Sequence, residues 1–179
     1  TCNSQTIENM NKKIESILNR QIIREGYSSH LYLAMASWAE NEGYKGIASW
    51  LYAQAEEERL HMLKFIKYIN ERGGKAIIPE IEKPPVRYAG VLKMFEEVLK
   101  HEQFITGSIN EIVQTCMEEK DFNTYQWVQW FVNEQLEEEA SVRTLLDSLR
   151  LAGDQHLYLF DRDIMSMRQK EKSADTAAE

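Results

Sequence analysis

The sequence predicts an all-α protein: a four-helix bundle with a long crossover between the second and third helices and a short fifth helix at the C-terminus. Two observations support this prediction. The 179 residues include only 3 Pro and 8 Gly, and the abundant Glu, Lys, Leu, Ala and Gln favour helices over strands. Apolar residues also recur every three or four positions along four long segments, which is the pattern of amphipathic helices.

Each long segment has an apolar stripe and a recognisable start or end. The first helix is expected to begin near Ser4 or Thr6, because either hydroxyl can cap it. Gly73 and Gly153 are expected to end the second and fourth helices. The expected ranges, in chain order, are about 4–41, 45–72, 90–119 and 122–152.

An irregular stretch over residues 73–89 separates the second helix from the third and contains Pro79, Pro84 and Pro85. A loop this long is unusual in a compact domain and needs a structural reason. Fully extended it reaches about 55 Å, whereas a helix of about 25 residues is about 37 Å long. The loop can therefore cross the whole bundle, which lets the third helix run parallel to the second.

The last segment, residues 155–168, is apolar almost all round. We expect it to pack in an interface between subunits, because so short a helix cannot bury all of its large side chains against one bundle. The side chains concerned are Leu157, Phe160, Ile164 and Met165. The tail from Gln169 is polar and is expected to be disordered.

Composition limits the classes of function. The formal charge of −8 argues against nucleic acid or an anionic membrane as partner. No apolar run approaches the roughly 18 residues of a membrane span, and there is no signal-peptide pattern. Cys2 and Cys116 are too far apart for a CxxC or zinc motif. We therefore expect one domain over residues 1–179, ordered from about residue 4 to 168, in a reducing, cytoplasmic setting.

Polar residues interrupt the four apolar stripes at a repeated spacing. In each half of the chain, the second residue of a set of three follows the first by 33 positions and the third follows the first by 36. The sets are Glu25, Glu58 and His61 in the first half and Glu102, Gln135 and Glu138 in the second. Each half thus gives one carboxylate, a hairpin return, and an i, i+3 pair on one helix face. Folding the halves together brings all six groups into one layer of the core.

Four of these side chains are carboxylates. Burial would force their pKa values strongly upward unless cations bound them, and two divalent ions would balance their charge without remainder. Oxygen-rich ligation with one imidazole suits iron or manganese, whereas structural zinc favours thiolate and several His. Any single Glu could instead be a boundary residue that reaches solvent, but the same spacing on four helices favours a dinuclear metal site.

Four short segments surround these residues. They are Glu25-Gly-Tyr-Ser-Ser-His-Leu-Tyr32, Glu57-Glu58-x-x-His61, Lys100-His-Glu102-Gln and Asn133-Glu-Gln-Leu-Glu-Glu-Glu139. Together they resemble bacterial non-haem ferritin, of the ferritin-like di-iron carboxylate family, and the resemblance covers about residues 6–168. It implies a first iron held by Glu25, Glu58 and His61. It implies a second held by Glu58, Glu102 and Glu138, with Glu58 as the bridge.

The resemblance also assigns neighbouring residues. Gln135 would lie beside the irons as a neutral group. Tyr32 would be an electron donor or hydrogen-bond partner, although a core aromatic is an equal alternative. A third iron site, shared with Glu138, is implied at Glu57, Glu134 and Glu137. For these three residues a solvated acidic face is the alternative.

The resemblance implies an iron-storage protein with ferroxidase activity, assembled as a cage of 24 like subunits. Fe(II) would be oxidised by O2 or peroxide and stored as a ferric mineral. No haem is expected, because Gln135-x-x-Glu138 stands where bacterioferritin has a second Glu-x-x-His. Two alternatives remain: a di-iron oxidase or oxygenase with an organic substrate, and a helical assembly with structural metals.

Overall fold

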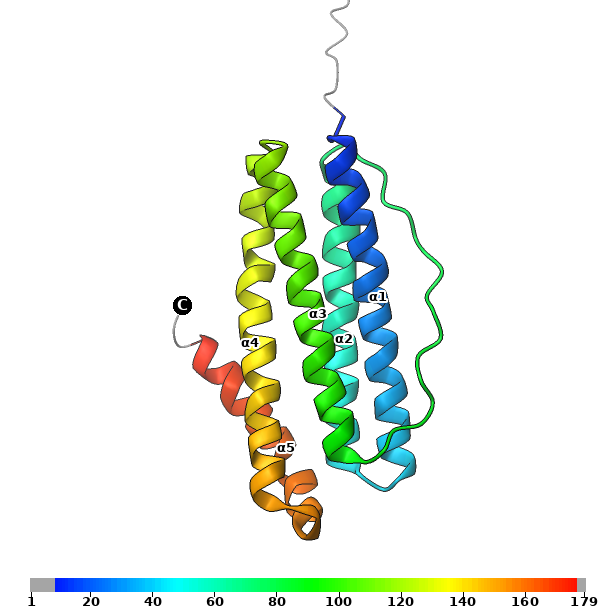
Figure 1. The fold of residues 1–179 in the computed structure, drawn as a ribbon, viewed down its shortest axis with the longest axis vertical. Coiled ribbons are helices and arrows are strands. Elements are labelled where there is room, and N and C mark those ends of the chain that lie inside the picture. The colour runs from blue at the N-terminus through cyan, green and yellow to red at the C-terminus, as the bar shows by residue number, and fades with distance from the viewer. Residues whose placement is uncertain (1–8, 177–179) are drawn as a thin grey trace, which may run out of the picture.

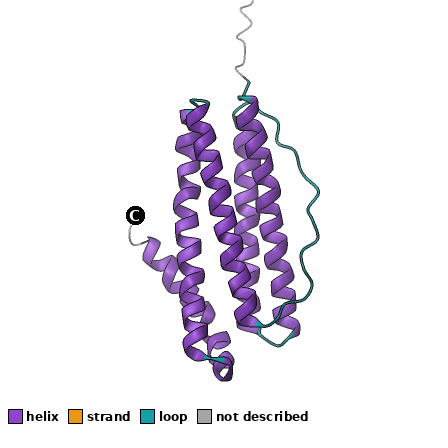
Figure 2. Cartoon of the chain, viewed as in Figure 1, coloured by secondary structure: helices purple, strands orange, loops and turns teal. Residues whose placement is uncertain are grey.

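The structure is a computed structural model that describes the backbone of residues 9–176 and the side chains of residues 9–168. The described chain contains four long helices, a short 3-10 turn and a C-terminal helix, with no strand in that part (Figures 1 and 2). The elements are α1 (Lys12–Asn41), α2 (Lys45–Glu71), α3 (Val91–Glu118), α4 (Phe122–Ala152), η1 (Asp154–His156) and α5 (Leu157–Thr176). The all-α bundle with a short C-terminal helix is confirmed.

The first helix begins later than the sequence suggested. Asn11 caps α1, and its Oδ1 accepts hydrogen bonds from the backbone N–H groups of Lys13 at 2.8 Å and Ile14 at 3.3 Å. An Asn at this position satisfies two of the N–H groups that a helix start leaves without partners. The start near residues 4–6 is therefore wrong, and those residues lie outside the described part of the chain.

The crossover spans the bundle as predicted. In Figure 1, α2 and α3 both run upward, and the segment between them descends beside α1. The side chain of Asn19 fastens this segment, because it donates to the carbonyl of Lys75 at 3.0 Å and accepts from the N–H of Ile77 at 2.8 Å. Further along, Ile81 packs so closely on Gly26 that a Cβ there would lie 2.7 Å from its Cδ1. Because the segment crosses the full length of the bundle, α2 and α3 run parallel.

The apolar core consists of two clusters, one towards each end of the bundle. On every long helix, polar residues separate the two clusters. On α3, for example, Val98 belongs to one cluster, Ile105 belongs to the other, and Glu102 lies between them. The predicted polar layer therefore lies in mid-bundle with apolar packing above and below it.

The C-terminal helix packs on its own bundle, which corrects two expectations. Phe160 and Ile164 are buried, and Leu157 and Met165 pack against the same cluster. The expectation that these side chains could not all face one bundle is therefore wrong. The helix also continues to Thr176, so the segment after residue 168, which was expected to be disordered, is helical over most of its length.

Within the described part of the chain, no helix has the length and apolar character that a membrane span requires.

Candidate metal centre

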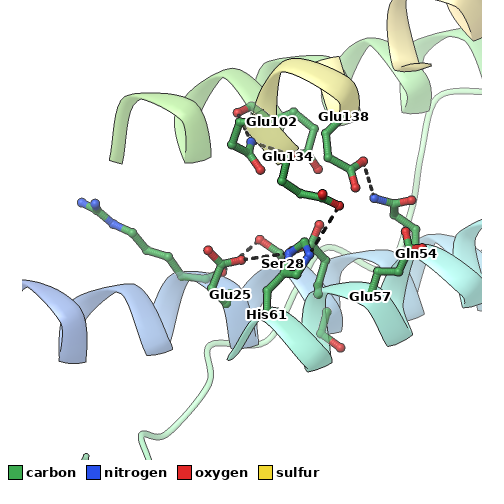
Figure 3. Close-up of polar contacts among 12 residues, drawn as sticks. Glu25, Ser28, Gln54, Glu57, His61, Glu102, Glu134 and Glu138 are labelled. Carbon is green, nitrogen blue, oxygen red and sulfur yellow. Dashed lines mark hydrogen bonds and ion pairs between the residues drawn. The ribbon is translucent and has the colours of Figure 1, made fainter. Parts of the chain in front are cut away.

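The polar layer gathers carboxylates from all four long helices. Glu25 comes from α1, Glu58 from α2, Glu102 from α3 and Glu138 from α4. None has more than 7% of its surface exposed. Figure 3 shows Glu25, Glu102 and Glu138 directed into the space between the α1–α2 and α3–α4 pairs. The layer predicted from the repeated spacing is thus present in the fold.

Three of the predicted residues form a compact donor set. Glu25, Glu58 and His61 each offer a ligand atom, and these atoms lie within 4.8 Å of one another; it is the one such set among the described residues. His61 Nδ1 lies 3.1 Å from Glu58 Oε2 and 3.9 Å from Glu25 Oε2. Glu25 Oε2 is buried and has no hydrogen-bond partner. A buried oxygen of this kind calls for a cation or another partner, and the donor set fits Fe(II).

The histidine ring is oriented by groups on both sides. Its Nδ1 faces the two carboxylates, whereas Nε2 lies 3.7 Å from Glu134 Oε1. The rings of Trp130 and Phe131 pack edge-on against the imidazole, with centroid distances of 5.4 and 5.8 Å. A second carboxylate beyond a ligating histidine fixes its orientation and raises its basicity. Glu134 is therefore placed to support His61.

The other two carboxylates make hydrogen bonds of their own. Glu102 accepts from the Tyr32 hydroxyl and from Gln135 Nε2, the latter at 3.1 Å. Glu138 accepts from Gln54 Nε2 at 2.6 Å (Figure 3). Tyr32 is fully buried, and its hydroxyl contacts the layer through Glu102. Glu102 and Glu138 belong to the layer but lie outside the compact set.

Burial strongly perturbs the titration of these groups. Desolvation raises the pKa of Glu58 and Glu102, and neighbouring carboxylates raise it further. Desolvation and the charge of Glu102 raise the pKa of Glu138 to about 8. Burial lowers the pKa of His61, but the neighbouring carboxylates of Glu134 and Glu58 outweigh this effect and bring the value to about 11. Bound protons therefore neutralise part of the negative charge of the layer. A divalent cation could replace these protons.

The residues suggested for a third iron site are less closely grouped. Glu57 forms an ion pair of 2.5 Å with Arg168 of α5. Glu134 faces His61, and Glu137 is exposed. Among the described residues, these three do not form a set with ligand atoms within 4.8 Å. The third site remains a proposal.

Four residues of this region escaped the sequence reasoning. Three were detectable. Gln21 and Gln54 each precede a layer glutamate by four positions, and Gln21 Nε2 donates to Glu25 Oε1 at 2.7 Å. Thr106 lies 3.3 Å from Gln135 Nε2 and gave no pattern. Arg168, the third detectable residue, follows Phe160 by eight positions on the stripe of α5 and is therefore a charged residue at a core position.

Comparison with known proteins agrees with this geometry. The family model for the ferritin-like domain matches residues 15–152, which is most of the chain. The chain belongs to the ferritin family. Among its curated relatives are a bacterial non-heme ferritin of Campylobacter jejuni and a probable bacterial non-heme ferritin-like protein of Haemophilus influenzae. Each is 38% identical, over 91% and 90% of this chain respectively and 99% of the relative.

The chain has the same fold as solved structures of other ferritins. An open pore ferritin from Archaeoglobus fulgidus superposes with a TM-score of 0.85 and 40% sequence identity, over 87% of this chain and 96% of that one. A humanized archaeal ferritin gives a TM-score of 0.85 and 41% identity over 87% and 95%. Membership of the ferritin family, drawn from the sequence motifs, is thereby confirmed.

Proposed function

We propose that this ferritin oxidises Fe(II) at the mid-bundle layer and stores the product as a ferric mineral. The observation that carries the proposal is the buried set of Glu25, Glu58 and His61, in which one carboxylate oxygen has no hydrogen-bond partner. Its place between two apolar clusters separates the reaction from bulk water. Relatives named bacterial non-heme ferritin support the assignment.

Iron is the substrate in this proposal. The first Fe(II) binds Glu25, Glu58 and His61 Nδ1, and the second binds Glu58, Glu102 and Glu138, with Glu58 as the bridge. Each Fe(II) gives up one electron. O2 takes two electrons and two protons and leaves as H2O2, or peroxide takes two electrons and two protons and leaves as two waters. Hard carboxylate oxygens favour Fe(III) over Fe(II) and thus assist the oxidation.

The hydrogen bonds around the second position define what must move. Glu102 has to loosen its contacts with both Tyr32 and Gln135 before both of its oxygens are free for an ion, and Glu138 is held by Gln54. The first site needs less rearrangement, because its donor atoms already converge. We therefore expect the two ions to bind with unequal affinity, the first at Glu25, Glu58 and His61.

Storage requires a cavity, and we propose that like subunits assemble into a cage of 24. Family membership supports this. The chain is further proposed to act in the cytoplasm, without haem, nucleic acid or a membrane partner. The two alternative functions predict different behaviour. A di-iron oxidase or oxygenase would consume an organic substrate, and a structural metal site would bind metal without turnover.

The test combines three measurements on the full chain. Anaerobic titration should show at least two tightly bound Fe(II) per chain, and admitting O2 should oxidise them rapidly. Repeated additions should load far more iron than two ions per chain, in a particle whose mass corresponds to 24 subunits. His61→Ala should slow the oxidation, whereas His30→Ala, at an exposed histidine of α1, should not. Two bound ions without mineral loading would contradict the storage function.

A further inference from the structure

The C-terminal helix is fixed to the start of α2 by a close backbone contact. A Cβ on Gly46 would lie 1.8 Å from the carbonyl oxygen of Asp161, so only glycine permits this approach. The carboxylate of Asp161 accepts a hydrogen bond of 2.8 Å from the N–H of Ile47. Tyr44, the N-cap residue of α2, makes no side-chain cap. An acceptor from α5 therefore supplies the cap that α2 lacks.

One stripe of α5 enters the bundle. Phe160 and Ile164 are buried, and the Phe160 ring meets the ring of Phe95 at 6.0 Å between centroids. The next residue on the stripe is Arg168, which is 8% exposed, with its guanidinium carbon 5.5 Å from the centre of the Trp50 ring. A buried arginine is costly unless its charge is paired.

Arg168 finds its partners beside the metal centre. Its Nη2 lies 2.5 Å from Glu57 Oε2, and its Nη1 donates to Gln54 Oε1 at 2.9 Å. The same Gln54 donates through Nε2 to Glu138 Oε2 at 2.6 Å. Figure 3 shows Gln54 close to both Glu57 and Glu138. Two hydrogen bonds thus link the guanidinium of α5 to a carboxylate of the layer.

We propose that Arg168 sets the number of divalent cations that the centre binds, by acting as the counter-ion of Glu57. The inference rests on the proposed function and concerns the third cation only. While α5 is docked, the guanidinium neutralises Glu57, and a cation approaching this carboxylate must displace it. Gln54 fixes the position of the guanidinium relative to Glu138, because it accepts a hydrogen bond from Arg168 and donates one to Glu138. The centre then takes two ions tightly and a third only weakly.

The arginine fork makes this arrangement specific. One side chain contacts a carboxylate and an amide oxygen at once, which a lysine ammonium on a flexible stem does less well. Lysine would nevertheless keep the positive charge. Arg168→Lys and Arg168→Gln therefore separate charge from shape, and Gly46→Ala displaces α5 while leaving Arg168 intact.

The experiment counts Fe(II) bound under anaerobic conditions to metal-free, full-length protein. In Arg168→Gln the third Fe(II) should bind at least about tenfold more tightly, in line with the loss of a charged hydrogen bond. Gly46→Ala should produce the same tightening, and Arg168→Lys should keep the third ion weak. Adding Glu57→Gln to Arg168→Gln should abolish the gain. Arg162→Gln is the matched control, because Arg162 is an exposed arginine of α5 paired with its neighbour Asp163.

Two results would count against different claims. If wild-type protein binds two Fe(II) tightly and neither Arg168→Gln nor Gly46→Ala changes the third, the counter-ion role is overturned and the proposed function stands. If wild-type protein binds no pair of ions tightly, the proposed function itself fails. Circular dichroism and particle mass identify a variant that does not fold, and Gly46→Ala then decides the question without loss of the charge.

Discussion

Replacing Glu138 with glutamine should stabilise the metal-free protein. The pKa of this carboxyl is raised from 4.5 to about 8, chiefly by desolvation, so it is mostly protonated in the folded chain at pH 7. In the unfolded chain it would ionise, 2.5 pH units above its ordinary pKa. Each unit corresponds to about 1.36 kcal/mol, so burial of this group costs about 3 kcal/mol at pH 7.

The glutamine variant avoids this cost, because it is neutral at every pH and its amide oxygen can still accept from Gln54. A gain of about 3 kcal/mol corresponds to a rise of roughly 6–12 °C in Tm for a chain of this size. The folded pKa lies above the unfolded one, so the wild-type contribution is complete below pH 4.5 and is lost as pH rises towards 8. The gap between variant and wild type should therefore be near zero at pH 4.5 and should widen up to pH 8.

The assay is thermal unfolding of chelator-treated protein at pH 4.5, 6, 7 and 8. Glu71→Gln, at an exposed position at the end of α2, is the control and should leave Tm unchanged. A Glu138→Gln protein that is less stable than wild type at pH 7 would refute the reasoning, and so would a gap that does not depend on pH. With Fe(II) present the order should reverse, because the glutamine is a poorer ligand for a cation than the carboxylate.

Three further predictions concern other parts of the molecule. Glu58→Ala should slow Fe(II) oxidation more than His61→Ala, because Glu58 is proposed to bind both ions and His61 only one. Stopped-flow absorbance measures the oxidation rates of the two variants, and equal rates would contradict the bridging role of Glu58. Tyr32→Phe should leave two Fe(II) bound but slow their oxidation, if the buried phenol donates an electron, and unchanged kinetics would leave it a hydrogen-bond partner only. Gly26→Ala should destabilise the fold by up to about 2 kcal/mol, because its Cβ would lie 2.7 Å from Ile81 Cδ1 and an overpacking cost of about 1–3 kcal/mol exceeds the roughly 1 kcal/mol that alanine gains over glycine inside a helix. Chemical denaturation measures this, and an unchanged midpoint would show that the crossover shifts freely.

Several features were determined by the sequence alone, because their physical causes are local or periodic. Helical periodicity fixes which residues share a face, so the interruption at Glu102, between Val98 and Ile105, could be placed in the core without coordinates. The repeated intervals then put the four carboxylates at one level. The length of the crossover set the direction of α3, since only a segment of that reach can return to the far end of the bundle.

The first residue of α1 and the surface against which α5 packs could be determined only from the tertiary structure. Several residues near the N-terminus can cap a helix, and local sequence does not choose among them; Asn11 caps α1 in the structure. The apolar surface of α5 indicated a partner without saying which. Its own bundle became that partner because Gly46 allows the backbone of Asp161 to approach α2.

The tertiary structure also decided which polar group each layer carboxylate meets. Glu102 meets Tyr32, 70 positions away, and Gln54 meets Glu138, 84 positions away. The ion pair of Glu57 joins residues 111 positions apart. Such pairings depend on helix rotation and on rotamers selected by the whole core, which no local pattern encodes. The sequence therefore determined that a carboxylate layer exists, and the packing of five helices determined how its charges are balanced.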